Sequence, residues 1–109
     1  MNEQAKQIIE AVAKGMTELA ALYGNVMGRM AEAEFQALWG LVQFKERRAA
    51  GILLLKAMTN DELVAHKRLI TDQAVLMAAD QATADKGITE FVWLVIRTLA
   101  SAVAGALIP

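Results

Sequence analysis

The sequence predicts an all-α protein that forms one domain over residues 1–109. Helix-forming residues such as Ala, Leu, Met, Glu and Lys dominate the chain, and its single proline is the terminal Pro109. No segment shows the strict apolar-polar alternation of a half-buried strand. The 109 residues, 56% of them hydrophobic, are enough for one core and too few for two. We expect about three helices, assembled into a helical oligomer: a long or kinked N-terminal helix, a capped middle helix and an apolar C-terminal helix.

The first expected helix covers the N-terminal half of the chain as far as Met58. Charged residues of alternating sign recur at every fourth position: Lys6, Glu10, Lys14 and Glu18. Apolar residues recur on the opposite side from Ile9 onwards, so this helix buries one face. From Met30 the pattern stays helical and becomes more apolar. An unbroken helix over this span would be about 80 Å long. A bend or hairpin at Gly24–Gly28 is the alternative.

The middle helix has the clearest predicted start. The hydroxyl of Thr59 can cap the first turn, while the side chain of Glu62 reaches back to the amide of the cap residue. The buried face of this helix is expected to include Leu63, His66, Ile70, Gln73, Ala74 and Met77. Glycine tolerates the left-handed turn that follows a helix, so Asp85-Lys86-Gly87 is expected to end it.

The C-terminal segment 88–108 is the most informative stretch of the chain. It is apolar apart from glycine and five polar residues: Thr89, Glu90, Arg97, Thr98 and Ser101. As a helix it would be about 31 Å long, the thickness of a bilayer's hydrocarbon core. Phe91 and Trp93 near its start suit the aromatic belt at a membrane surface. Arg97 opposes this interpretation, because an arginine in mid-membrane costs about 2.5 to 3.5 kcal/mol. The segment is therefore either a membrane span or the buried central helix of a bundle or oligomer.

Small residues at helical spacing suggest close packing between helices. They occur in the first helix, at Gly24 and Gly28, and in the last, at Ser101 and Gly105. Such faces let two helix backbones approach each other, which drives association in lipid and permits tight packing in water. We therefore expect an oligomer or membrane interface at Gly24, Gly28, Phe91, Trp93, Arg97, Ser101 and Gly105.

The residues that chemistry would need are scarce. The chain has no cysteine and one histidine, His66, and its one serine is Ser101, far from His66 in sequence. We expect His66 to be a core or interface histidine bonded to a carboxylate, and we predict no catalytic, cofactor-binding or metal site. Metal bound through His66 would revive an enzymatic hypothesis. Eleven basic and twelve acidic residues give no general attraction to nucleic acid. We also expect no small-molecule substrate.

These observations lead to two functional hypotheses. The first is a non-enzymatic structural or channel-type homo-oligomer, membrane-associated through residues 88–108, of the kind found in virions, secretion systems or envelope assemblies. The second is a soluble, cytoplasmic helical adaptor or dimerisation module that binds a protein partner through its methionine and alanine faces.

Overall fold

The chain folds entirely into helices in the part that the structure describes. The computed structural model describes residues 3–14, 17–78 and 80–107. Within these ranges there are six α-helices: α1 (Glu3–Lys14), α2 (Glu18–Arg29), α3 (Glu32–Gln43), α4 (Arg47–Lys56), α5 (Asn60–Met77) and α6 (Gln81–Leu107). The all-α prediction is confirmed. The expected count of about three helices is wrong, because the segment expected to form the first helix is divided into four.

Four helices replace the single N-terminal helix. The expected bend at Gly24–Gly28 is wrong, since both glycines lie inside α2. The helix starts after Thr17, whose hydroxyl accepts a hydrogen bond from the amide of Ala20 at 3.2 Å. It ends where Met30 turns to extended backbone, with ψ at 140°. Residues 15–16, between α1 and α2, lie outside the described ranges.

The turn between α3 and α4 explains why sequence reasoning missed this break. Lys45 has a φ of 57°, the left-handed conformation that usually belongs to glycine. The amide of Glu46 donates to the carbonyl of Leu41 at 2.9 Å, and that of Lys45 to Val42 at 3.1 Å. This pair of bonds is the Schellman arrangement, which satisfies the last carbonyls of a helix. Because a lysine occupies the position, no glycine or proline marks the end of α3.

The start of α5 is as predicted, but its end is not. The hydroxyl of Thr59 accepts from the amide of Glu62 at 3.2 Å, and the Glu62 carboxylate accepts from the amide of Thr59 at 2.9 Å. The helix ends at Met77, well before Gly87, which lies inside α6. Asp80 caps α6 instead, since its carboxylate accepts from the amide of Thr83 at 2.9 Å. This hydrogen bond lowers the pKa of the Asp80 carboxyl.

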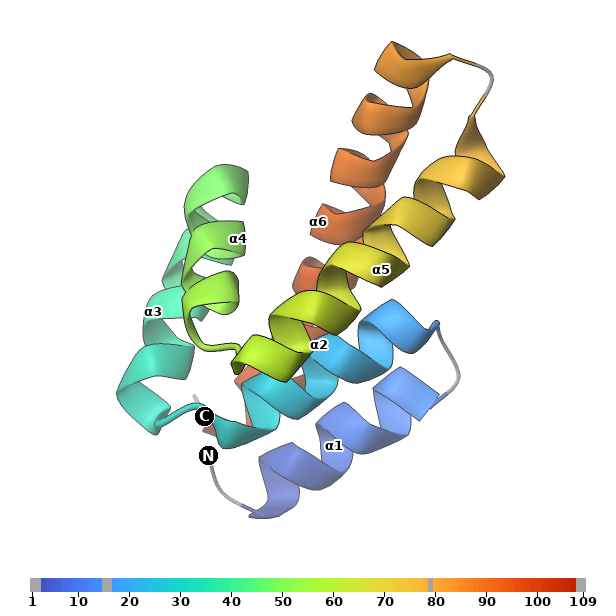
Figure 1. Ribbon diagram of the computed structural model, residues 1–109. Coiled ribbons are helices and arrows are strands. Elements are labelled where there is room, and N and C mark those ends of the chain that lie inside the picture. Colours follow the sequence, from blue (N-terminus) through green and yellow to red (C-terminus); the bar gives the residue numbers. More distant parts are fainter. Residues whose placement is uncertain (1–2, 15–16, 79, 108–109) are drawn as a thin grey trace.

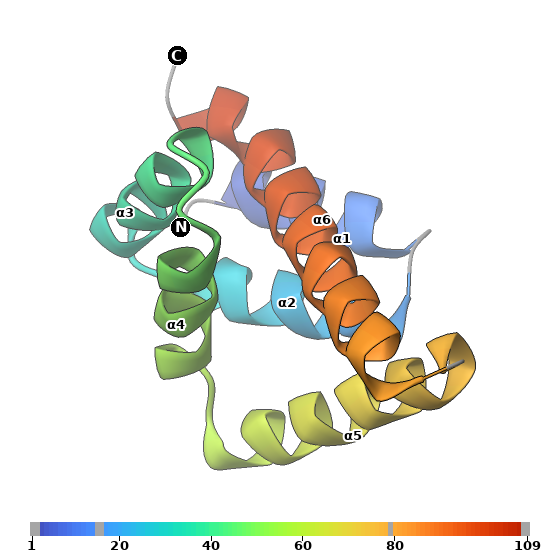
Figure 2. The same ribbon diagram turned by 90° about the horizontal axis from the view of Figure 1, so that it is seen from above.

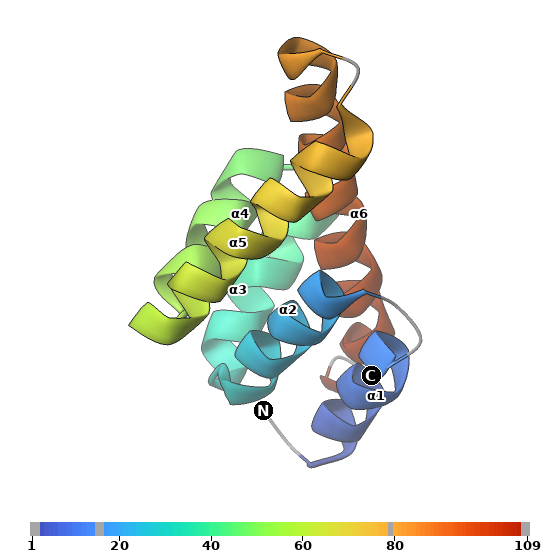
Figure 3. The same ribbon diagram turned by 45° about the vertical axis from the view of Figure 1, so that its right-hand side comes forward.

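The helices form three antiparallel pairs, α1 with α2, α3 with α4, and α5 with α6 (Figures 1 and 2). Helix α6 also packs against α1, α2, α3 and α4, so it touches every other helix. Figure 3 shows the far end of the α5–α6 pair projecting beyond the other helices.

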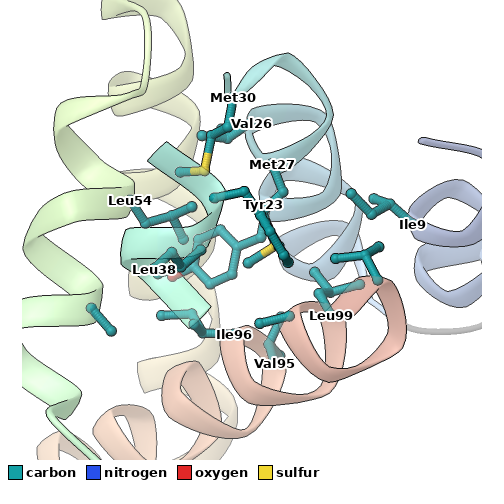
Figure 4. Close-up of a cluster of buried hydrophobic side chains, with 14 of the residues drawn as sticks. Ile9, Tyr23, Val26, Met27, Met30, Leu38, Leu54, Val95, Ile96 and Leu99 are labelled. Carbon is teal, nitrogen blue, oxygen red and sulfur yellow. The ribbon is translucent and has the colours of Figure 1, made fainter. Parts of the chain in front are cut away.

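The core gathers around one side of α6. Figure 4 shows Val95, Ile96 and Leu99 of α6 facing the buried side chains of the other helices. Their largest fully buried neighbours are Ile9, Leu19, Tyr23, Met27, Met30, Phe35, Leu38 and Leu54. Helix α5 differs from the rest, because none of its residues is fully buried. The core therefore rests on five helices, and α5 lies across its outside.

Candidate functional site

An apolar groove opens between α4, α5 and α6. These helices border the triangular arrangement of ribbons in Figure 2, in which α4 and α5 diverge from their connecting turn. The groove has a volume of about 480 Å³, within the range of ordinary binding pockets. Its described lining residues are Arg47, Arg48, Gly51, His66, Ile70, Ile88, Thr89, Val92, Trp93 and Ile96. We call this site the α4–α5–α6 groove.

The lining of the groove is mostly apolar on α6. Trp93 and Ile96 belong to the core as well as to the groove, and they are only 6% and 1% exposed. Ile70 and Val92 are half-buried beside them. On α4, a Cβ added to Gly51 would meet nothing within 4 Å. The absence of a side chain at Gly51 therefore keeps that wall of the groove open.

Two arginines bring positive charge to the groove. Arg47 forms a 2.6 Å ion pair with Glu90, and its guanidinium lies 5.7 Å from the ring centre of Trp93. Arg48 is exposed and has no ion-pair partner among the described residues. No acidic residue is among the described lining residues. The groove thus combines an apolar interior with a cationic edge.

His66 closes the side of the groove nearest α2. Its Nε2 lies 2.7 Å from the Tyr23 hydroxyl, and the two rings stack with centroids 5.5 Å apart. Burial lowers the pKa of His66 and raises that of Tyr23. The lowered pKa favours the neutral imidazole, and which of the two groups donates this hydrogen bond depends on the tautomer of His66. A carboxylate partner was expected for His66, but its side-chain hydrogen bond among the described residues is with Tyr23. The carboxylate of Glu62, one turn before His66, pairs with Arg29, which lowers the pKa of Glu62. Within the described ranges, no three His, Asp or Glu side chains cluster in a way that could hold a metal ion.

The predicted interface residues Phe91, Trp93 and Arg97 of α6 differ in their exposure to solvent. Trp93 is buried, whereas Phe91 is half-buried and Arg97 is exposed. These three residues border a shallow depression beside the ion pair of Arg47 and Glu90. The ion pair of Glu90 is thus formed with a residue of the same chain.

Segment 88–108 was expected in a membrane or at the centre of a bundle or oligomer because its composition is almost wholly apolar. In the structure, however, one side of α6 is exposed and partly polar. Arg97, Ser101 and Gly105 are exposed on one side, together with Leu94, which is 47% exposed. The opposite side carries Val95, Ile96, Leu99 and Val103, each at most 1% exposed. Residues Ala82–Gly105 are nevertheless long and apolar enough to cross a bilayer. The buried core helix of a bundle meets the same criterion.

The remaining predicted residues, Gly24 and Gly28, lie on α2 facing α1. Gly24 is buried, and a Cβ added at Gly28 would come within 3.7 Å of the Cγ of Lys6. These two glycines therefore belong to a contact between two helices of the same chain, in which Gly28 has room for an added Cβ at ordinary contact distance. They are separate from the residues of α6.

The groove itself was not predicted from the sequence. The local signal for the groove in the sequence was the basic pair Arg47 and Arg48, with Gly51 three residues after Arg48 on a helix. Nothing local connects them with His66 or Trp93. Comparison with known protein families, with the sequences of characterised proteins and with solved structures finds no match to this chain.

Proposed function

We propose that this protein is a non-enzymatic helical adaptor that binds the apolar face of a partner's helix in the α4–α5–α6 groove. The observation that supports this most strongly is the groove itself. It is an open, largely apolar surface, formed where α4 and α5 diverge beside α6. Docking of an amphipathic helix into such a groove is a recurrent mode of protein recognition.

Apolar side chains near the groove support a partner larger than a small molecule. Ile52 and Leu55 lie one and two turns after Arg48 on α4, and they are 43% and 36% exposed. On α5, Leu63 lies two turns before Ile70 and is 40% exposed. These side chains extend the apolar surface along both diverging helices. A helix of about 14 residues, about 21 Å long, would cover them together with the groove.

Filling the groove tests this proposal. Gly51→Leu places a side chain in the groove, and Gly40→Leu on α3 is the matched control, because an added Cβ meets nothing within 4 Å at either glycine. The probes are synthetic amphipathic peptides of about 14 residues, with leucines at helical spacing on one face. Binding is measured by calorimetric titration. We expect the wild type and Gly40→Leu to bind alike, and Gly51→Leu to bind at least tenfold more weakly.

Two results would contradict the adaptor function. One is that no amphipathic peptide, whatever the charge of its polar face, binds the wild-type protein. The other is that Gly51→Leu binds as tightly as Gly40→Leu, which would place the peptide elsewhere. Circular dichroism of both variants checks that each is folded before titration.

A second candidate is a membrane-associated homo-oligomer, favoured by the length and apolar character of Ala82–Gly105. In that version, Arg97, Ser101 and Gly105 would face another copy. Insertion of α6 as a span would remove Leu99 and its neighbours from the core, a loss of stabilisation that speaks against it. Flotation with phosphatidylcholine vesicles distinguishes the two candidates. Protein that floats, and that loses this property in Leu94→Asp but not in Leu76→Asp, would support the membrane role.

A further inference from the structure

We propose that the helix bound in the α4–α5–α6 groove is acidic, with carboxylates beside its apolar face that pair with Arg48 and Lys67. This inference rests on the proposed adaptor function and adds the chemistry of the partner. Charge complementarity carries it, because the described residues that line the groove include two arginines and no acid.

The two arginines play different parts. The guanidinium of Arg47 already neutralises Glu90 and lies over the ring of Trp93, so its charge is largely satisfied within the chain. Arg48 is exposed and has no ion-pair partner among the described residues. Arg48 is therefore the cation that the α4 side of the groove offers to a partner.

A second cation stands on the opposite side of the groove. Lys67 does not line the groove itself, but it follows the lining residue His66 and lies three residues before the lining residue Ile70, which places it beside the groove on α5. Its side chain is exposed, and no ion pair in the described part of the chain involves it. The carboxylate of Glu62, which precedes Lys67 on α5, already forms an ion pair with Arg29. Arg48 on α4 and Lys67 on α5 are thus both exposed cations without an ion-pair partner among the described residues.

The residues on either side of a bound helix's apolar stripe would lie close to Arg48 and Lys67. Its apolar stripe would face Ile70, Val92 and Trp93, while residues to either side of the stripe approach α4 and α5. Glutamate or aspartate at those flanking positions would pair with Arg48 and Lys67. Lysine or arginine there would be repelled, so the rim selects between partners of opposite charge.

Two peptides with the same leucine face and opposite flanking charge test this inference. One carries glutamate at the flanking positions and the other lysine. We expect the acidic peptide to bind about tenfold more tightly at low salt, since each exposed charge pair contributes about two- to fivefold. The preference should shrink as salt is added. Arg48→Glu and Lys67→Glu should each reduce the preference, and the double variant should reverse it. Lys14→Glu, which makes the same charge change at the end of α1, should leave it intact.

The outcomes separate this inference from the proposed function. Equal binding of both peptides, abolished by Gly51→Leu, would overturn the charge preference and leave the adaptor function standing. Failure of both peptides would remove the adaptor function. A preference for the acidic peptide that survives the double reversal would overturn the inference, because other residues would then carry it. Binding of dodecanoate that depends on Gly51, without binding of the acidic peptide, would also overturn it and identify an acyl-chain site.

Discussion

Helices α5 and α6 pack against each other, yet they are stabilised in different ways. Helix α6, of 27 residues, presents a continuous side of fully buried apolar residues to the core. Helix α5, of 18 residues, has none that is fully buried, and Val64, Val75 and Leu76 are more than 70% exposed. Helix α6 is therefore stabilised mainly by the burial of its apolar side chains.

Polar contacts near the N-terminal end of α5 add to the packing of its half-buried Leu69 and Ile70 against the core. The capping box of Thr59 and Glu62 fixes its start, and Arg29 of α2 binds both carboxylate oxygens of Glu62. One turn later, His66 bonds to Tyr23. Such contacts each contribute about 1 kcal/mol, far less than a buried side of a helix. Because these polar contacts also stabilise α5, part of the apolar surface of α5 can remain exposed beside the open groove.

The largest expected difference between the two helices lies in leucine truncation. Leu99→Ala removes a fully buried side chain of α6 and should lower the free energy of unfolding by about 2 to 5 kcal/mol. Leu76→Ala removes a side chain of α5 that is 79% exposed and should change it by less than about 0.5 kcal/mol. Urea denaturation followed by circular dichroism measures both. Similar losses in the two variants would mean that α5 is buried in solution, for example against another copy.

The next effect concerns the cap of α5. Thr59→Ala should lower the free energy of unfolding by about 1 kcal/mol, since the amide of Glu62 loses its acceptor. Thr71→Ala is the matched control in the exposed middle of the same helix. Amide hydrogen exchange should accelerate in the first turns of α5 in Thr59→Ala, with α6 little affected. Equal acceleration in α6 would show that the two helices unfold as one unit.

A pH dependence should follow from the half-buried imidazole of His66. Because burial lowers its pKa below the ordinary value of 6.5, the unfolded chain binds more protons than the folded one near and below that pH. Stability should therefore be full above about pH 7 and fall as the solution is acidified. Arg47 and Arg48 line the same groove as His66, and Glu62, one turn before His66 on α5, is paired with Arg29. Denaturation at pH 7.5 and 5.5 measures the loss, and His66→Gln should show less of it. A loss of equal size in His66→Gln would assign it to other groups.

The smallest expected effect compares two glycines that lie inside helices. Gly40→Ala should raise the free energy of unfolding by about 0.5 to 1 kcal/mol, because alanine favours the helix and its Cβ meets no neighbour. At Gly87 of α6, an added Cβ would lie 2.6 Å from the Cε of Met77, so the end of that side chain must move. Gly87→Ala should therefore gain less than Gly40→Ala. Equal gains, measured by urea denaturation, would show that α5 adjusts to α6 without loss.

Some of these features follow from local sequence. The Thr59 cap was predictable because the residues that form it lie within one turn of each other. The apolar positions Ile9, Leu19 and Tyr23 were correctly expected to be buried. The helix ends at Met30 and Lys45 were not predictable, because neither has the glycine or proline that usually marks a break. Gly87 misled in the opposite sense, since it serves close packing against Met77 and not a turn.

The candidate site shows the same division. Arg48 and His66 were visible in the sequence as a basic residue and a lone histidine, and Trp93 as an aromatic residue of an apolar segment. Their meeting in one groove depends on how α4, α5 and α6 cross, which brings together residues that are far apart in the chain. The Tyr23–His66 hydrogen bond spans 43 positions and has no local signal.

The sequence by itself determined that the chain is helical and where its most clearly capped helix begins, because helix propensity and capping act over a few neighbouring residues. Only the tertiary structure decided how many helices there are, which side of α6 is buried, and where an apolar surface remains open. Those outcomes depend on packing between distant segments, where competing arrangements differ by the burial of whole helix faces.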